Sequence, residues 1–374
     1  MTPSNVYFTT FRTSFRENLL QKLERLIKKA GLFEQVDFQN KYAAIKIHFG
    51  EPGNLAYLRP NYSKVLADLI KEHGGKPFLT DCNTLYIGGR KNALDHLDSA
   101  YTNGYNPFTT GCHILIADGL KGTDEALVPV DGEYVKEAKI GQAIMDADIF
   151  ISLNHFKGHE STGFGGAIKN IGMGCGSRAG KMEMHNATSP FILQDKCIGC
   201  HACERNCAHG AISFQEKKAF IDENRCVGCG RCIGVCPVDA VANHCDESND
   251  ILNKKIAEYT LAVVKDRPHF HISLVVDVSP YCDCHAENDV PIVPNVGMFA
   301  SFDPVALDMA CVDLCNKQPV INGSILSANM EEHHVHEEDT DRFNLTHPDT
   351  NWRSCIEHGV KIGLGTDKYE LIEI

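Results

Sequence analysis

The amino-acid sequence predicts an α/β protein, in which a parallel or mixed sheet carries helices on both faces and is interrupted by a small cysteine-rich insertion. Strand-like and helical apolar segments alternate along the chain, and this alternation is found on both sides of the insertion. The insertion itself is indicated by cysteine spacing, because eight of the 17 cysteines fall between residues 197 and 236. A chain of 374 residues is long enough for at least two domains.

The individual elements follow from hydrophobic periodicity. Apolar runs predict strands at 6–11, 43–48, 77–79, 114–117, 149–153, 272–276 and 369–374. Apolar residues at helical spacing predict helices at 16–30, 63–73, 137–147, 251–265 and 305–315. Asp303 stands directly before Pro304 and is expected to cap the last of these helices. The strands after the insertion are too few for a sheet of their own, so we expect them to join the earlier strands.

Eight cysteines form two copies of one metal-ligand run, Cys-x2-Cys-x2-Cys-x3-Cys. The first copy is Cys197, Cys200, Cys203 and Cys207, and the second is Cys226, Cys229, Cys232 and Cys236. This spacing is typical of bacterial-type ferredoxins with two [4Fe–4S] clusters, in which the fourth cysteine of each run binds the other cluster. We therefore assign one cluster to Cys197, Cys200, Cys203 and Cys236, and the other to Cys226, Cys229, Cys232 and Cys207.

Two other interpretations of the cysteine runs fit less well. Zinc takes four ligands in two pairs and needs no third cysteine close to each pair. The pattern of Cys197, Cys200 and His201 matches a haem attachment motif, but the cluster already explains these cysteines. The sequence therefore predicts an α+β ferredoxin domain at 189–243, with a short hairpin between Ala211 and Asp222. Residues 1–188 and 244–374 are expected to form one discontinuous α/β domain around it.

Composition excludes some classes of partner and indicates a compartment. The formal net charge of −13 argues against a nucleic-acid partner. No window of the sequence approaches a membrane span, and the N-terminus has no signal-like stretch. Many cysteines without such a signal indicate a reducing cytoplasm. The oligomeric state stays open.

The segment directly after the predicted strand 149–153 is the second informative feature. It combines histidines, lysines and glycines, and ligands of open α/β sheets bind beyond the carboxyl ends of strands. Glycines let the backbone approach a ligand and expose N–H groups to an anion. The predicted catalytic residues are Lys169, His159, His185 and His155, and the predicted cofactor-binding residues are Gly163, Gly165, Gly166 and Asn170.

Two expectations about this segment can be tested against a structure. Burial in a pocket is expected to lower the pKa of Lys169 and make its amine a better nucleophile or covalent anchor. The alternative for the segment is a glycine-rich crossover with solvated side chains, in which Lys169 pairs with a carboxylate such as Glu160 and only braces the loop.

Three stretches carry a resemblance to a known family. They are Lys157–Gly172, Ser301–Asp308 and Ile362–Gly365. In combination they resemble the DUF362 family, in its subgroup with an inserted ferredoxin, over nearly the whole chain. The resemblance implies the architecture given above rather than a particular reaction.

The pattern His159-x3-Gly163-Phe164-x-Gly166-x2-Lys169 is also similar to one in the lactate racemase family. The resemblance implies that Lys169 carries a nickel-pincer nucleotide, that His159 is an acid or base, and that His185 binds nickel. Arg59 with Pro60 resembles that family's substrate-binding segment. Gly165 and the pair Ala167-Ile168 depart from the family pattern, and Thr84 falls near the place of its second catalytic histidine.

Cys282, Cys284 and His285 follow the predicted strand 272–276. Two thiols and an imidazole at a strand end could hold a third metal or contact a cluster. They could equally be the free thiols of a loop.

These observations favour an iron–sulfur oxidoreductase or electron-transfer protein with two [4Fe–4S] clusters and a ligand or substrate site in the α/β core. The core could also hold an additional metal or a nucleotide-type cofactor. The alternatives are a non-catalytic electron carrier or iron–sulfur scaffold that docks a partner, and a racemase-like isomerase with structural clusters. We expect the partner to be a redox protein or a small-molecule substrate. A pocket lined by Lys169 and His185 would favour an enzyme, and a flat, exposed cluster face would favour the carrier.

Overall fold

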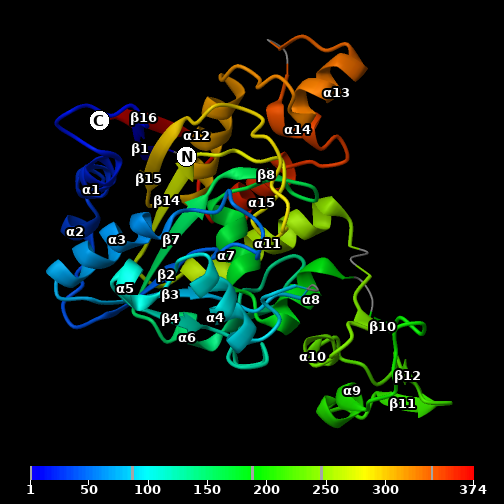
Figure 1. Ribbon diagram of the computed structural model, residues 1–374. Coiled ribbons are helices and arrows are strands. Elements are labelled where there is room, and N and C mark those ends of the chain that lie inside the picture. The colour runs from blue at the N-terminus through cyan, green and yellow to red at the C-terminus, as the bar shows by residue number, and fades with distance from the viewer. Residues whose placement is uncertain (1, 86–87, 187–188, 245–246, 338–339) are drawn as a thin grey trace.

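The structure, a computed structural model, describes residues 2–85, 88–186, 189–244, 247–337 and 340–374. Figure 1 shows a large core of helices around one sheet, with a small module set to one side of it. The predicted α/β class is confirmed, because a mostly parallel sheet forms the centre of the core.

The central sheet has eight strands in the order β16-β1-β15-β14-β7-β2-β3-β4. All of them run parallel except β15, which is antiparallel to both of its neighbours. The strands are β1 (Ser4–Thr10), β2 (Tyr42–Lys46), β3 (Lys76–Asp81), β4 (His113–Ile116), β7 (Ile149–His155), β14 (His269–Val275), β15 (Gly297–Ser301) and β16 (Tyr369–Glu373).

Strands from both sides of the cysteine-rich segment pair directly in this sheet. β7 pairs with β14, and β1 pairs with both β15 and β16. The C-terminal strands therefore complete a sheet that the N-terminal half begins. The division of the chain at 188 and 244 into two domains stays a prediction, and residue 188 itself lies outside the described residues.

The sheet has a hydrophobic core on each face, as the alternation of its strands requires. In β7, Ile149, Ile151 and Leu153 pack in the core under α1 (Leu19–Lys29) and α3 (Pro60–Glu72). Phe150 packs in the opposite core, which is covered by α7 (Ala167–Cys175), α11 (Asn249–Val264), α12 (Pro304–Asn316) and α15 (Arg353–Lys361). Figure 1 shows the two groups of helices on opposite sides of the sheet.

The remaining elements of the core are short, and one of them corrects the sequence analysis. They are α2 (Leu32–Gln35), α4 (Ala93–Thr102), α5 (Pro107–Thr110), β5 (Glu125–Pro129), β6 (Glu137–Gly141), α6 (Gln142–Met145), α8 (Arg178–His185), α13 (Ile325–His333) and α14 (Arg342–Thr346). The helix predicted at 137–147 is wrong: β6 occupies its first half, paired antiparallel with β5. Ala138 and Ile140 alternate inward there, and only four residues of helix follow.

The small module contains the two cysteine runs. Its elements are β10 (Phe191–Ile192), α9 (Ala202–Asn206), β11 (Ile212–Gln215), β12 (Lys218–Ile221), α10 (Arg231–Gly234) and β13 (Val241–Ala242). The predicted hairpin is confirmed, since β11 and β12 pair antiparallel through a two-residue turn at Glu216 and Lys217, both with positive φ. Leu85 and Met182 of the core pack into the module's hydrophobic cluster, so the module docks beside α8.

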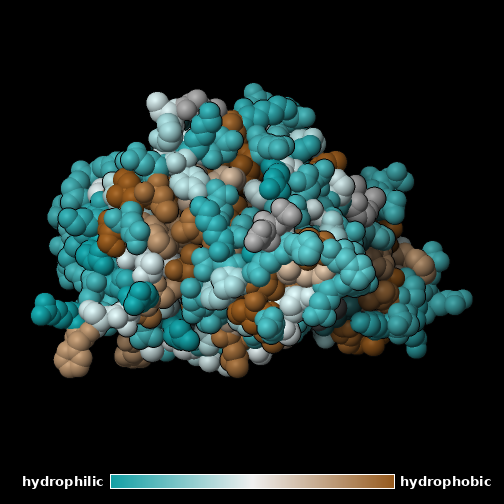
Figure 2. Space-filling view, turned by 90° about the horizontal axis from the view of Figure 1, so that it is seen from above, coloured by the Kyte–Doolittle hydropathy of each residue, from teal (hydrophilic) through white to brown (hydrophobic). Residues whose placement is uncertain are grey.

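Hydrophilic side chains dominate the face of the molecule that Figure 2 shows, with hydrophobic residues in small groups among them. Within the described ranges, every helix is too short or too polar to cross a membrane.

Candidate active site and cysteine cavities

A pocket of about 500 Å³ lies where four parallel strands end. Each strand supplies residues at or just after its carboxyl end: Lys46 ends β2 and His48 follows it, Asp81 ends β3, Lys157 and His159 follow β7, and Cys282 and Cys284 follow β14. This is where open α/β sheets bind ligands. The other lining residues come from α7, α8, α11, the cysteine-rich module and the segments that follow β3, β8, β13 and β14. They include Thr84, Arg90, Glu160, Lys169, Asn170, Lys181, His185, Val241 and His285.

The glycine-rich segment is a buried hairpin. β8 (Lys157–His159) and β9 (Gly163–Gly165) pair antiparallel, and all six residues are buried. Gly163 begins β9 with φ +81°, a conformation that favours glycine. The alternative of a solvated crossover is therefore wrong, because Lys157–His159 and Gly163–Gly165 are buried and Gly158 is hydrogen-bonded to Ser279 of the loop after β14.

The structure brings most of the predicted catalytic residues together. Lys169, His159 and His185 all line the pocket, from α7, β8 and α8. His155 does not line it: its Nδ1 lies 2.8 Å from Asp283 Oδ1 and its Nε2 lies 2.7 Å from Val276 O. Both ring nitrogens are engaged by these two groups of the chain after β14, which hold the imidazole away from the pocket. His155 therefore acts from behind the pocket, by holding Asp283.

The predicted cofactor-binding residues divide in the same way. Gly165 and Asn170 line the pocket. Asn170 accepts a hydrogen bond from Lys46 Nζ at 2.9 Å, so it also orients that lysine. Gly163 serves the hairpin turn, and Gly166 allows a close approach of Asp308 to the start of α7.

The surroundings of Lys169 correct one expectation. Its Nζ lies 3.5 Å from Cys282 Sγ. Burial lowers the pKa of Lys169, but the sulfurs of Cys282 and Cys284 and the carboxylate of Glu160 together outweigh burial and raise it. We therefore expect a charged ammonium group here, not the neutral amine that burial alone would produce. Glu160 itself bonds to His285 Nε2 at 2.9 Å, so Lys169 does not simply brace the loop.

Two of the histidines that line the pocket with Lys169, namely His159 and His185, are uncharged at neutral pH. Burial lowers the pKa of His159 to about 4 and that of His185 to about 3. Neutral imidazoles can accept a proton or bind a metal.

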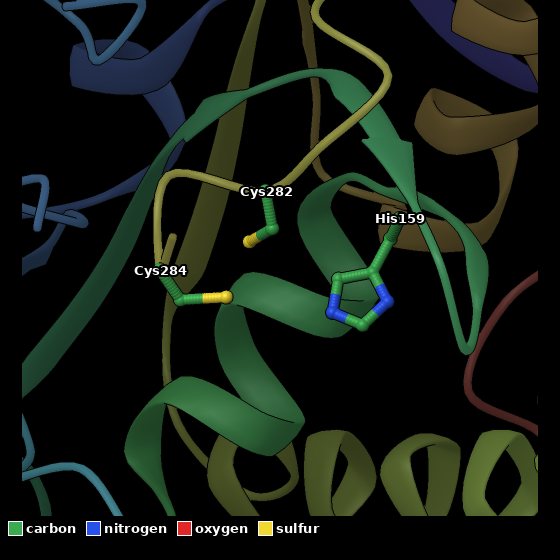
Figure 3. A group of neighbouring side chains, drawn as sticks. All are labelled: His159, Cys282 and Cys284. Atoms are coloured by element: carbon green, nitrogen blue, oxygen red, sulfur yellow. The ribbon is translucent and has the colours of Figure 1, made fainter. Parts of the chain in front are cut away.

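Three ligand-type side chains meet beside Lys169. The sulfurs of Cys282 and Cys284 and a ring nitrogen of His159 lie within 4.8 Å of one another. Figure 3 shows them around a common space, with the thiols on the loop after β14 and the imidazole on β8. The sequence analysis grouped these thiols with His285, but His159 takes that place, because His285 turns to Glu160.

Several charged residues of the pocket were missed by the sequence analysis. Lys46 forms an ion pair of 3.0 Å with Asp81, and Arg90 forms one of 2.7 Å with Glu51. Arg90 also lies 2.9 Å from the ring of His48. The available signal was Lys46 itself, a charged residue at the end of an otherwise apolar strand. With Lys157, Lys169 and Lys181 added, cations outnumber the acidic groups that line the pocket.

The structure groups the cysteines of the two runs into two small cavities. Cys197, Cys200, Cys203 and Cys236 line one of them. Cys207, Cys226, Cys229 and Cys232 line the other. Each set joins three cysteines of one run to the fourth of the other, which is the grouping of the crossed assignment. Binding of clusters there stays a prediction.

The two loops share one backbone conformation. Gly199 and Gly228 occupy equivalent positions with φ +67° and +68°, and His201 and Gly230 follow with φ +62° and +64°. Each loop then leads into a short helix, α9 or α10. Backbone N–H groups of Ala211 and Ala240 donate to the sulfurs of Cys207 and Cys236 at 3.3 and 3.2 Å. Hydrogen bonds to the sulfurs are among the features that set the reduction potential of an iron–sulfur cluster.

The other motif residues lie outside the pocket. Asp303 caps α12 as predicted, accepting the N–H groups of Val305 and Ala306. Gly365 lies so close to this carboxylate that a Cβ could not fit. Arg59 lies away from the main pocket, in a shallow surface hollow with Thr13 and Tyr62. The part of the racemase pattern around Arg59 is therefore not brought to the site.

Comparison with known proteins shows the family. The chain belongs to the DUF362 family, described as a domain of unknown function, whose model matches residues 43–313. It is 27% identical over 124 residues to the thylakoid-associated protein sll1697 of Synechocystis, covering 33% of this chain and 35% of that protein. The chain thus spans about a third of the length of this relative.

Two solved structures are similar to parts of this chain. One is a structural-genomics crystal structure of a Thermotoga maritima protein, with a TM-score of 0.40 and 14% identity over 78% of this chain and 57% of that one. The other is the lactate racemase apoprotein of Thermoanaerobacterium thermosaccharolyticum, with a TM-score of 0.35 and 13% identity over 73% and 51%. The cysteine cavities and the cluster of His159, Cys282 and Cys284 fit a metal-binding α/β protein.

Proposed function

We propose that this protein is an iron–sulfur oxidoreductase, in which two [4Fe–4S] clusters in the module exchange electrons with a ligand in the pocket of the core. The observation that carries this proposal is that the pocket and one cysteine cavity are lined by a common residue. Val241 lines both the pocket and the cavity of Cys197, Cys200, Cys203 and Cys236. Ile233, which lies between Cys232 and Cys236, also lines the pocket. Little more than one layer of side chains therefore separates the pocket from the cysteines.

The chemistry of both cavities supports a cluster in each. Each offers four thiols, and the other lining residues are mostly apolar, among them Ile192 and Val238 in one and Ile212 and Ile221 in the other. Four thiolates in an apolar surrounding are the usual ligand set of a [4Fe–4S] cubane. When bound, such clusters supply single electrons. Arg178 lies against the second run, and its charge would partly offset that of the thiolates of Cys229 and Cys232.

The residues of the pocket favour a small anionic ligand. Lys157, Lys169 and Lys181 line it, and Lys169 is held charged by its neighbours. Ammonium groups in a partly desolvated pocket bind carboxylate or phosphate groups, and they stabilise negative charge that develops during a reaction. His159 and His185, both neutral, are placed to accept or donate a proton beside that anion.

Electrons would enter at the outer side of the module. Cys200 is exposed, and Ile198 and Val227, which follow the first cysteine of each run, have exposed fractions of 63% and 60%. An exposed apolar rim next to a cluster suits brief docking of a redox partner protein. This feature also supports the second candidate, a carrier without catalysis. The buried pocket with Lys169 and His185 favours the enzyme.

A racemase-like isomerase with structural clusters remains a third candidate, because Lys169, His159 and His185 share the pocket. One experiment separates the three functions. Anaerobically purified protein is analysed for iron, sulfide and any ligand or lysine adduct by mass spectrometry, and the clusters are then reduced with dithionite. For the oxidoreductase we expect about eight iron and eight sulfides per chain, and reoxidation of the clusters by the ligand that co-purifies.

The other outcomes are equally clear. Turnover that is indifferent to the redox state of the clusters would support the isomerase. Clusters that reoxidise only with a partner protein, in a chain that retains no ligand, would support the carrier. Protein that contains zinc without sulfide would contradict all three.

A further inference from the structure

We infer that His159, Cys282 and Cys284 bind one divalent transition-metal ion of the zinc type, at a site separate from the two cysteine cavities. The inference deepens the proposed function, because this ion would face the same pocket. Its three ligand atoms already lie within 4.8 Å of one another. Figure 3 shows both sulfurs and one ring nitrogen turned toward a common space.

The loop that carries the two thiols is anchored by the residue between them. Asp283 is fully buried, and its carboxylate contacts His155 Nδ1 at 2.8 Å and Lys157 Nζ at 3.5 Å. Its carbonyl oxygen accepts the N–H of Glu51 at 2.8 Å. With residue 283 fixed at side chain and backbone, Cys282 and Cys284 have little freedom to move apart. This explains why His155 is buried behind the site, and such supporting contacts are typical of metal sites.

The imidazole is fixed in a similar way. The N–H of Gly158 donates to Ser279 O at 2.8 Å, which ties β8 to the loop of the thiols. Nδ1 of His159 accepts the backbone N–H groups of Ser161 and Thr162 at 3.0 and 3.3 Å. The nitrogen that faces the sulfurs in Figure 3 is therefore Nε2, and an ion would take the place of its proton.

The donor set selects the class of metal. Two thiolates and one imidazole suit zinc and its neighbours in the first transition row, whereas calcium and magnesium prefer oxygen ligands. Three protein ligands leave a fourth position open toward the pocket, as in catalytic zinc sites. Lys169 Nζ, 3.5 Å from Cys282 Sγ, would donate to a metal-bound thiolate. An ion here would polarise an oxygen of the bound anion, and His185 rather than His159 would then be the imidazole that transfers a proton.

The test uses the full chain with its clusters, so that iron and sulfide report on the clusters separately. Protein treated with a mild chelator is titrated anaerobically with zinc, and then with cobalt as a spectroscopic probe. We expect one equivalent of zinc beyond the iron, and thiolate-to-cobalt charge-transfer bands. Cys282→Ser, Cys284→Ser and His159→Ala should each weaken zinc binding at least about tenfold while iron content is unchanged.

Two matched variants provide the controls. Cys355→Ser removes a partly buried thiol outside the pocket, and His285→Gln changes the neighbouring imidazole; both should keep the zinc. The assignment would be overturned if Cys284→Ser retained zinc. It would also be overturned if His285→Gln lost zinc while His159→Ala kept it. A mass lower by two daltons in protein that takes up no metal would also overturn it, because Cys282 and Cys284 would then form a disulfide. Wild-type protein that binds one equivalent of zinc but contains no iron would contradict the proposed function and would still support this metal site.

Discussion

Single side chains fix the backbone around the pocket. Asp308 of α12 accepts the N–H groups of Ala167 and Ile168, at 2.7 and 3.0 Å. These are the first residues of α7, so the carboxylate holds the start of the helix that carries Lys169. The contact depends on Gly166, because a Cβ at that position would overlap Asp308 Oδ1. Gly166 and Asp308, which both belong to sequence motifs, therefore have a structural role that could not be predicted from the sequence.

Gly166→Ala should lower the stability of the fold by about 1–3 kcal/mol, because the new methyl group displaces the Asp308 carboxylate. Gly165→Ala is the matched control. Its Cβ would lie 3.4 Å from Lys169 Cδ and 3.5 Å from Lys157 Cε, which is ordinary contact. Thermal denaturation should separate the two variants, and only Gly165→Ala should reduce ligand binding without a loss of stability. Equal melting temperatures would contradict this account.

The crossed cysteine pairing makes a prediction that double variants can test. Cys200→Ser and Cys236→Ser should each remove the same cluster, so the double variant should retain about four iron, like either single one. Cys200→Ser combined with Cys207→Ser should lose both clusters. Iron and sulfide analysis of anaerobic protein measures the difference. Retention of about four iron by the second pair would show that each run binds its own cluster.

At this scale the sequence predicted part of the site. Lys169, His159 and His185 follow one strand end within a short segment, and this local pattern was sufficient to predict a shared pocket. The contact of Lys169 with Cys282 spans 113 residues, and nothing local indicates it. The sequence analysis expected a lowered pKa for Lys169, but the pKa is raised. The sulfurs that raise it come from a loop that is distant in the sequence.

One buried carboxylate joins helices and loops on the face of the sheet that α7, α11, α12 and α15 cover. Glu258 of α11 accepts the N–H groups of Glu133 and Val135 at 2.8 and 2.7 Å, and lies 2.9 Å from His358 Nε2 of α15. It thereby connects α11, the turn before β6 and α15. Burial alone would raise the pKa of Glu258, but the hydrogen bonds outweigh it and lower the pKa.

Glu258→Gln should destabilise the protein by about 2–4 kcal/mol at neutral pH, because a neutral amide cannot accept all of these bonds and turns a donor toward N–H groups. The lowered pKa gives the sign of the pH dependence. The contribution of the carboxylate is complete above its usual pKa of 4.5 and is lost as pH falls through the lower folded-state value. Denaturant unfolding, followed by the fluorescence of the single Trp352, should show the gap between wild type and variant closing in acid. A gap that widens in acid would contradict this role.

The elements that periodicity predicted correctly are those with a clear apolar face. α1 and α3 bury leucines and isoleucines at helical spacing, and β7 begins with the apolar residues Ile149, Phe150 and Ile151 and is buried throughout. The failure at 137–147 has a physical cause: Ala138 and Ile140 fit a strand as well as a helix, and pairing with β5 decides between them. α7 and α8 were missed because their glycines disfavour helix locally. Gly172 and Gly180 are needed there, since a Cβ would meet the backbone of Ile256 and Lys139.

At the scale of the whole molecule, the module and the core act on one space. Val241 and Ile233 of the module line the pocket, and Leu85 and Met182 of the core pack into the module. Lys91 Nζ donates to Cys236 O at 3.2 Å and pairs with Asp239. The residues on both sides of this contact are far apart in the sequence. The sequence could therefore predict a module inserted in a core, but not that residues of the module line the pocket of the core.

The ligand site and the cysteine cavities should therefore be separable by mutation. Lys169→Ala should abolish ligand binding or turnover, because it removes the charged ammonium group that Cys282, Cys284 and Glu160 stabilise in the pocket. Both clusters should remain, since Lys169 lines neither cavity. The melting temperature should change by less than about 3 °C, because the side chain faces the pocket and not the packed core.

Lys64→Ala is the matched control, since it removes an exposed lysine that pairs with Asp68 on α3. Ligand retention by native mass spectrometry, iron and sulfide content, and thermal denaturation are measured on both variants under anaerobic conditions. If Lys169→Ala loses iron together with the ligand, the pocket and the module form one structural unit. If it retains full ligand binding, the cations of the pocket serve only to neutralise buried acids, and the carrier becomes the better account of this protein.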